Sequence, residues 1–130
     1  MKYVSDQIAQ GRQSILASGG NLTARIVADA AKQGDELARE GFVRAGTFIG
    51  QATADFLHIF NPSIVIFGGG VTLSGDLILD PIKASMRKNV MDPAYLDGLQ
   101  IATARLGDDA GLLGSLAQAH VRLSKAGTPH

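Results

Sequence analysis

The amino-acid sequence predicts an α/β fold whose helices and strands follow the order α-α-α-β-α-β-α. Three observations lead to this fold class. A long helical pattern ends at Pro62, a short apolar strand follows at residues 64–67, and a second strand at 99–104 comes after a further helix. Two strands that are joined through a helix form a right-handed parallel unit. We therefore expect a small parallel sheet that is covered mainly by helices.

Composition limits the class of protein. Hydrophobic residues make up 45% of the 130 residues, which is ample for the core of one domain or of part of a larger one. The formal net charge is zero, which argues against nucleic-acid contact by this segment. The absence of cysteine excludes disulfides and thiolate metal sites and fits a cytoplasmic location. No apolar run approaches the roughly 18 residues of a membrane span, and residues 1–6 lack the apolar core of a signal peptide.

The amino-terminal part of the chain predicts two helices. Apolar side chains recur over residues 4–17, where we expect a helix that is interrupted at Gly11. Thr23 stands where an N-cap is needed, because its hydroxyl can accept from the free N–H groups of a first turn. The helix that it begins runs over residues 24–33, and Gly34 ends it.

The longest helix is predicted over residues 36–60, with Asp35 as its N-cap. Gly46, Gly50 and Ala54 lie four residues apart on it, so another helix or a sheet can approach this side closely. Interior glycine costs roughly 1 kcal/mol against alanine, and two of them in one helix therefore indicate a packing role. Residues at steps of three and four define the buried face that we expect. They are Phe42, Ala45, Gly46, Ile49, Thr53, Phe56 and Phe60.

The strand at residues 64–67 is predicted to be buried, because it is a short, continuous run of apolar residues. Three glycines follow it at positions 68–70 and remove every β-carbon from the carboxyl end of the strand. In open α/β sheets ligands bind at that end, and glycine lets the backbone approach a nucleotide. The alternative is that the glycines only form a permissive turn between strand and helix.

The second half of the chain predicts two more helices and a strand. We expect a short turn at residues 76–79 and then a helix over 81–90 with Pro81 in its first turn. After the strand at 99–104, Gly107-Asp108-Asp109 opens a last helix over residues 110–124. Its apolar residues predict a buried side. They are Leu112, Leu113, Leu116, Ala119 and Leu123.

A sheet of two parallel strands is a poor foundation for this much helix. The edge next to residues 64–67 must pair with something that this chain does not supply. Because a sheet edge and helix faces are left uncovered, we predict self-association into a dimer or larger species, which light scattering would detect.

Two stretches of the sequence resemble the carboxy-terminal part of the ROK family, named after repressors, open reading frames and sugar kinases. The first runs from Asn61 to Val71 and reads Asn-Pro-Ser-Ile-Val-Ile-Phe-Gly-Gly-Gly-Val, with Gly75-Asp76 after it. The second runs from Leu106 to Gly114 and reads Leu-Gly-Asp-Asp-Ala-Gly-Leu-Leu-Gly. Gln33-Gly34-Asp35 also matches the usual lead-in to the long helix. The resemblance extends over nearly the whole chain, and the family includes bacterial glucokinases.

This resemblance implies the carboxy-terminal part of an actin-like ATPase (ribonuclease H-like) domain, with ATP and Mg²⁺ as the family's cofactors. Carried over by position, Gly68, Gly69, Gly70 and Val71 would line the adenine and ribose of the nucleotide. A glycine-lined carboxyl end of a strand fits such a role.

Several sequence motifs of the family are missing from this chain. The Asp-x-Gly-Gly-Thr phosphate loop, the catalytic aspartate, the Glu-x-Gly-His sugar-binding element and the cysteine-rich zinc motif do not occur in residues 1–130. Phosphoryl transfer needs such groups to position and stabilise the reacting atoms. We therefore assign no catalytic or metal-binding residue, interpret the three histidines as surface or capping residues, and expect no sugar phosphorylation by this chain alone.

Three functions remain open. The first is a fragment of an ATP-dependent sugar kinase that transfers a phosphoryl group to a hexose, as glucokinase does, and contributes the adenosine-binding side. The second is the corresponding part of a ROK transcriptional repressor that responds to a sugar. The third is a non-catalytic, oligomerising α/β module. The resemblance favours the kinase.

Overall fold

The computed structural model describes residues 1–18, 20–106 and 109–126 and shows an α/β protein. The helices and strands are α1 (Lys2–Ala9), α2 (Ala24–Lys32), α3 (Glu36–Phe60), β1 (Ile64–Phe67), α4 (Asp76–Asn89), β2 (Gln100–Thr103) and α5 (Ala110–Ala126). Three short 3-10 helices lie between them: η1 (Ile15–Ser18), η2 (Gly70–Ser74) and η3 (Pro93–Leu96). Within the described ranges, no helix is long and apolar enough to cross a membrane.

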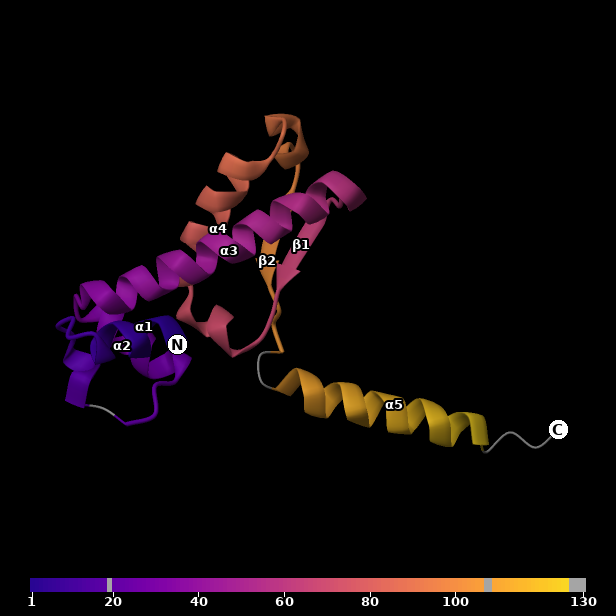
Figure 1. Cartoon of the computed structure of the whole chain (residues 1–130). Helices are drawn as coiled ribbons and strands as arrows, with labels where there is room; N and C mark the ends of the chain where they lie inside the picture. The colour runs from indigo at the N-terminus through magenta and orange to yellow at the C-terminus, as the bar shows by residue number, and fades with distance from the viewer. Residues whose placement is uncertain (19, 107–108, 127–130) are drawn as a thin grey trace.

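Helix α3 is the axis of the fold (Figure 1). Helices α1 and α2 pack near its amino-terminal end, while α4 lies along its carboxy-terminal half together with the two strands. Helix α5 extends away from the other elements. The largest fully buried side chains come from α1, α2, α3 and α4, which form one core. They are Leu37, Leu57, Ile78, Ile82, Met86, Val4 and Val27.

The predicted N-caps of α2 and α3 are confirmed. The Thr23 hydroxyl accepts a hydrogen bond from the Ile26 N–H at 3.3 Å. The Asp35 carboxylate accepts from the Ala38 N–H at 2.8 Å. Each cap satisfies one of the N–H groups that a first helical turn leaves without a partner. Helix α3 has the predicted bounds, and it ends where Asn61 takes a left-handed conformation with a φ of 41°.

Helices α3 and α4 approach each other closely at two glycines, as predicted. A β-carbon on Gly50 would lie 2.4 Å from the Ile82 carbonyl oxygen, and one on Gly46 would lie 2.5 Å from the Pro81 β-carbon. The contact also carries a hydrogen bond from the Ser85 hydroxyl to the Thr47 carbonyl oxygen at 2.7 Å. Only glycine permits this distance between the two backbones.

Strands β1 and β2 form a two-stranded parallel sheet in which Ile64 is opposite Gln100 and Phe67 is opposite Thr103. The predicted burial of β1 is wrong for half of its residues. Val65 and Phe67 are half-buried against the core, whereas Ile64 and Ile66 on the other face are 43% and 60% exposed. Side chains alternate along a strand, and here helices cover only one face of the sheet.

The predicted interruption of the first helix at Gly11 is confirmed, but the helix does not resume beyond it. Helix α1 ends at Ala9, because Gly11 takes a φ of 89° that no helix contains. The chain then turns, and the later apolar residues Ile15 and Leu16 belong to η1 instead. Two hydrogen bonds anchor this segment to the start of α3: Asp35 accepts from the Ser14 hydroxyl at 2.7 Å and from the Ile15 N–H at 2.8 Å.

The prediction of a separate turn before Pro81 is also wrong. Helix α4 begins at Asp76 and continues through Pro81 without a break. The proline lies in the second turn, where the helix loses a single hydrogen bond to the Leu77 carbonyl oxygen. Its side chain packs against Gly46 on α3.

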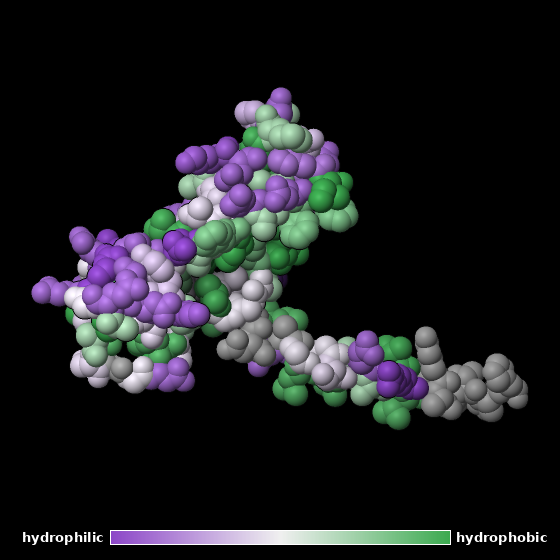
Figure 2. Space-filling model, viewed as in Figure 1, coloured by the Kyte–Doolittle hydropathy of each residue, from purple (hydrophilic) through white to green (hydrophobic). Residues whose placement is uncertain are grey.

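The predicted buried face of α3 is confirmed in part, whereas the predicted buried side of α5 is wrong. On α3, Phe42, Gly46 and Thr53 are buried, but Phe56 and Phe60 are 57% and 70% exposed. On α5 the predicted buried side lies in solvent, and hydrophobic side chains gather along this helix in Figure 2. They are Leu112, Leu113, Leu116, Ala119 and Leu123. The described part of the chain supplies no surface that covers them. Gly107 and Asp108, which we expected to open this helix, lie outside the described residues.

Candidate functional site

The three glycines form the turn between the carboxyl end of β1 and η2. Gly68 lies next to the end of β2, since a β-carbon on it would lie 3.4 Å from the Ala104 β-carbon. Gly69 has a φ of 93°, a backbone conformation that residues other than glycine rarely adopt. Thr72 closes the turn, because its N–H and its hydroxyl donate to the Gly69 carbonyl oxygen at 3.0 and 2.7 Å.

A cleft of about 280 Å³ opens between α2 and η2, beside this turn. Its lining residues are Arg25, Ala28, Asp29, Lys32, Gly70, Leu73 and Ser74. We call it the α2–η2 cleft. Of the four residues predicted to bind a nucleotide, Gly70 lines the cleft. Gly68 and Gly69 belong to the adjoining turn, and Val71, which is 39% exposed, follows Gly70 in η2.

The α2–η2 cleft has a positive balance of charge. Arg25 and Lys32 carry two positive charges and Asp29 carries one negative charge, which leaves a net charge of +1 among the lining residues. None of the three side chains forms an ion pair within residues 1–18, 20–106 and 109–126. The two cations are therefore free to meet an anionic ligand, because no carboxylate within the described residues neutralises them.

Sequence reasoning missed the contribution of α2 to this cleft. The helical period carries the signal, because positions 25, 29 and 32 are separated by four and three residues and so share one face of α2. What the sequence alone does not indicate is that this face meets the glycine turn. That contact joins segments far apart in the chain.

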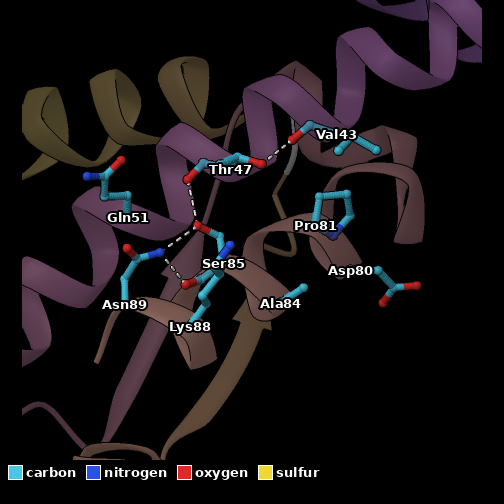
Figure 3. A pocket seen from close by; sticks show the side chains of 9 residues that line it. All are labelled: Val43, Thr47, Gln51, Asp80, Pro81, Ala84, Ser85, Lys88 and Asn89. Atoms are coloured by element: carbon cyan, nitrogen blue, oxygen red, sulfur yellow. Dashed lines mark hydrogen bonds between the residues drawn. The ribbon is translucent and has the colours of Figure 1, made fainter. Parts of the chain in front are cut away.

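A second cavity, of about 590 Å³, lies on the outer side of α3 and α4 and is open to solvent (Figure 3). Its lining residues are Val43, Thr47, Gln51, Asp80, Pro81, Ala84, Ser85, Lys88 and Asn89. We call it the outer groove. Its neutral polar groups largely satisfy one another. The Asn89 amide donates to the Ser85 carbonyl oxygen at 2.7 Å, and the Ser85 hydroxyl donates to Thr47.

Of the two histidines that the structure describes, His58 has a structural role. The His58 Nε2 accepts from the Met91 N–H at 3.0 Å, and the His58 ring contacts the Tyr95 ring edge-on at 5.0 Å between centroids. His120 lies exposed on α5, and His130 lies outside the described residues. Within the described ranges, no three histidine, aspartate or glutamate side chains come together as a metal site would require.

One charged cluster lies away from both cavities and joins α1 to α3. The Arg12 Nη1 lies 2.6 Å from the Glu40 Oε2, and the Tyr3 hydroxyl donates to the same carboxylate. These hydrogen bonds hold the pKa of Glu40 below its ordinary value, and the bond to Glu40 raises the pKa of Tyr3. Because the groups are exposed to solvent, the pair adds little stability.

Comparison with known proteins identifies the class. Residues 3–122 match the ROK family, and the chain therefore belongs to the ROK family. It is 35% identical to the glucokinase of Thermotoga maritima over 92 residues, which is 71% of this chain and 29% of that protein. It is 24% identical to the DNA-binding transcriptional repressor Mlc of Escherichia coli, over 78% of this chain and 25% of the repressor.

The structure agrees with this assignment. It superimposes on a ROK family glucokinase from Streptomyces griseus in complex with glucose and AMPPNP with a TM-score of 0.74 and 32% identity. The match covers 87% of this chain and 38% of the glucokinase. The chain thus spans about a third of the length of the curated relatives that it matches. Both sugar kinases and repressors are among its homologues.

Proposed function

We propose that residues 1–130 are the carboxy-terminal portion of a ROK sugar kinase domain with the actin-like ATPase (ribonuclease H-like) fold. The portion contributes the adenosine-binding side to an enzyme that transfers a phosphoryl group from ATP to a hexose, as glucokinases do. One observation carries the proposal: the glycine turn at the end of β1 adjoins a cleft that contains two unpaired cations. Ligands of α/β proteins bind at this end of a strand.

The dimensions of the α2–η2 cleft fit part of a nucleotide. Its volume of about 280 Å³ is near the lower end of the range of ligand pockets, which suits a nucleoside better than a whole ATP molecule. We place the adenine and ribose against the backbone of Gly68, Gly69, Gly70 and Val71. The phosphates then lie within reach of the cations on α2, which attract their negative charge.

On their own, the described residues do not complete a Mg²⁺ site. No group of three acidic or histidine side chains comes together in the described ranges, and Asp29 is the one carboxylate among the lining residues. Mg²⁺ usually binds through one or two carboxylates together with substrate phosphates. In our proposal the remaining carboxylates, the phosphate loop and the catalytic base come from the other part of the kinase. This chain alone is then inactive.

The uncovered apolar surfaces support the idea that a larger protein completes this fold. Ile64 and Ile66 expose one face of the sheet, and α5 exposes a row of leucines. Surfaces of this kind mark sites where another polypeptide packs. In the proposal the rest of the kinase covers them, and in its absence the chain self-associates.

A ROK repressor is the second candidate. The homology to Mlc supports it, because a repressor of the family shares this part of the fold. The kinase is favoured because the identity to glucokinases reaches 35%, against 24% to Mlc.

Titration of the purified chain with ADP by calorimetry tests the proposed nucleotide site. We expect weak binding that the double variant Arg25→Glu, Lys32→Glu weakens by about tenfold or more, since two favourable charges become repulsive. The matched control is Lys83→Glu, Arg87→Glu, which makes the same change of net charge on α4, outside the cleft.

Equal weakening by both double variants would show a non-specific charge effect and contradict the cleft as the binding site. If the wild-type protein binds no ADP at millimolar concentration, the proposal that this chain binds a nucleotide is wrong. Circular dichroism of each variant establishes that the fold is intact.

A further inference from the structure

Ser74 is a buried residue whose hydroxyl has no hydrogen-bond partner within residues 1–18, 20–106 and 109–126. Among the residues that the structure describes, four polar or charged side chains are buried: Asp35, Thr53, Ser74 and Ser85. The other three each form a hydrogen bond of 2.8 Å or less. Buried hydroxyls are normally paired, so the Ser74 hydroxyl requires a partner that the described part of the chain does not supply.

The local backbone does not use this hydroxyl. Serine often caps a helix that starts just after it, but the N-cap of α4 is Gly75, and no side chain bonds to the first turn there. A hydroxyl can also donate back to a carbonyl of its own turn, as Thr72 does to Gly69 at 2.7 Å. In the described ranges Ser74, at the end of η2, forms no bond of this kind. Neither ordinary structural role explains a hydroxyl at this position.

The Ser74 hydroxyl is open to the α2–η2 cleft. Ser74 is 8% exposed, and it lines this cleft. Within the described residues, every side-chain oxygen or nitrogen that is fully enclosed has a hydrogen-bond partner. The Ser74 hydroxyl has no such partner and is therefore not enclosed. The cleft is the route by which a ligand reaches it.

The α2–η2 cleft has a neutral floor and a charged rim. Ala28 and Ser74 form the floor, because they are 4% and 8% exposed. Leu73, which is 69% exposed, lies at the rim. The three charged residues of α2 that line the cleft are exposed as well. The end of a ligand that enters most deeply therefore meets the methyl group of Ala28 and a single hydroxyl.

We propose that the floor of this cleft binds the base of the nucleotide and that the Ser74 hydroxyl forms a hydrogen bond with the polar edge of the base. The phosphates stay at the rim, beside Arg25 and Lys32. This inference rests on the proposed nucleotide site, and it adds the orientation of the ligand and a binding residue outside the glycine turn.

The chemistry of the two ends of a nucleotide favours this orientation. Adenine is flat and largely apolar, and its edge carries ring nitrogens that accept and an amino group that donates. A serine hydroxyl both donates and accepts, so it pairs with either kind of group. A phosphate at the floor would lose its hydration and gain one neutral hydroxyl in return, which is unfavourable. At the rim it keeps contact with water and meets two cations.

Titrations followed by NMR with three probes test the orientation. The probes are ADP, adenosine, which lacks the phosphates, and tripolyphosphate, which lacks the base. Loss of one hydrogen bond in Ser74→Ala is expected to weaken ADP and adenosine alike, by about fivefold, and to leave tripolyphosphate unaffected. The double variant Arg25→Glu, Lys32→Glu should do the reverse: it weakens ADP and tripolyphosphate and leaves adenosine within about twofold. The matched control is Ser85→Ala, which removes a buried hydroxyl outside the cleft.

A cysteine at position 74 reports on the floor directly, because the chain contains no other cysteine. Thiol and hydroxyl are similar in size, so Ser74→Cys preserves the packing. We expect iodoacetamide to alkylate this cysteine in the folded protein, and we expect saturating ADP or adenosine, but not tripolyphosphate, to slow the reaction by about fivefold or more. The control is Ser63→Cys, which is exposed outside the cleft and should react at the same rate with every probe.

The outcomes separate this inference from the proposed function. ADP binding that Ser74→Ala leaves unchanged would overturn the inference, while the nucleotide site itself would stand. Protection of Ser74→Cys by tripolyphosphate as strong as that by adenosine would place the phosphates at the floor and overturn it as well. A cysteine at position 74 that does not react in the folded protein would show that the position is sealed from the cleft, with the same consequence. Wild-type protein that binds no ADP would overturn both proposals.

Discussion

Replacing Gly50 by alanine is expected to lower the free energy of unfolding by about 2 kcal/mol, although alanine is the better helix former. The new β-carbon would lie 2.4 Å from the Ile82 carbonyl oxygen and 2.6 Å from the Ser85 β-carbon. The higher helix propensity of alanine stabilises the folded state by roughly 1 kcal/mol. Overpacking destabilises it by up to about 3 kcal/mol, because backbone atoms cannot rotate away from the new β-carbon. The steric cost therefore exceeds the gain.

Urea unfolding followed by circular dichroism measures this difference. Gly114→Ala is the matched control, because Gly114 also lies in a helix but a β-carbon there meets nothing within 4 Å. It should leave the stability unchanged or raise it slightly. A Gly50→Ala variant as stable as Gly114→Ala would mean that α3 and α4 do not pack as closely as described.

Local signals made much of the fold predictable from the sequence. Thr23 and Asp35 begin helices because their side chains bond to N–H groups only three residues away. Asn61 and Pro62 end α3 in the same local manner. The break at Gly11 was predictable for the same local reason, whereas the apolar residues beyond it did not reveal that the chain forms η1 there instead of resuming the helix.

Burial was harder to predict, because it depends on what covers a residue. The run Ile64–Phe67 is apolar throughout and reads as a strand that is buried on both faces, but helices cover only the face of Val65 and Phe67. The same holds for Phe56 and Phe60 on α3. In our proposal the remaining part of the kinase domain covers these side chains.

The sequence predicted the glycines of the candidate site but not its charged residues on α2. The residues at 68–70 stand out because they follow an apolar strand directly. Arg25 and Lys32 belong to an amphipathic helix, in which charged residues usually only face solvent. Their meeting with η2 is a tertiary contact between distant segments, and a single sequence contains no direct signal of it.

Replacing Asp35 by alanine is expected to lower the free energy of unfolding by about 3 kcal/mol. The carboxylate is buried and accepts from the N–H of Ala38, the hydroxyl of Ser14 and the N–H of Ile15. Loss of a helix cap costs about 1 kcal/mol, and each buried donor left without an acceptor costs about as much again. Asp35→Asn separates the two effects, since its amide oxygen can still cap α3 while its amide nitrogen cannot accept from Ile15.

The same carboxylate makes stability depend on pH. Burial disfavours its charged form, but the hydrogen bonds from Ala38, Ser14 and Ile15 outweigh burial and hold the pKa of Asp35 below its ordinary value of 3.8. The unfolded chain therefore takes up a proton before the folded chain does. This contribution to stability is complete above about pH 5 and is lost as the pH falls below 3.8 and through the lower pKa of the folded state.

Urea midpoints measured from pH 6 to pH 3 should fall more steeply for wild-type protein than for Asp35→Asn. Parallel curves would show that Asp35 titrates alike in both states and would contradict its network of hydrogen bonds.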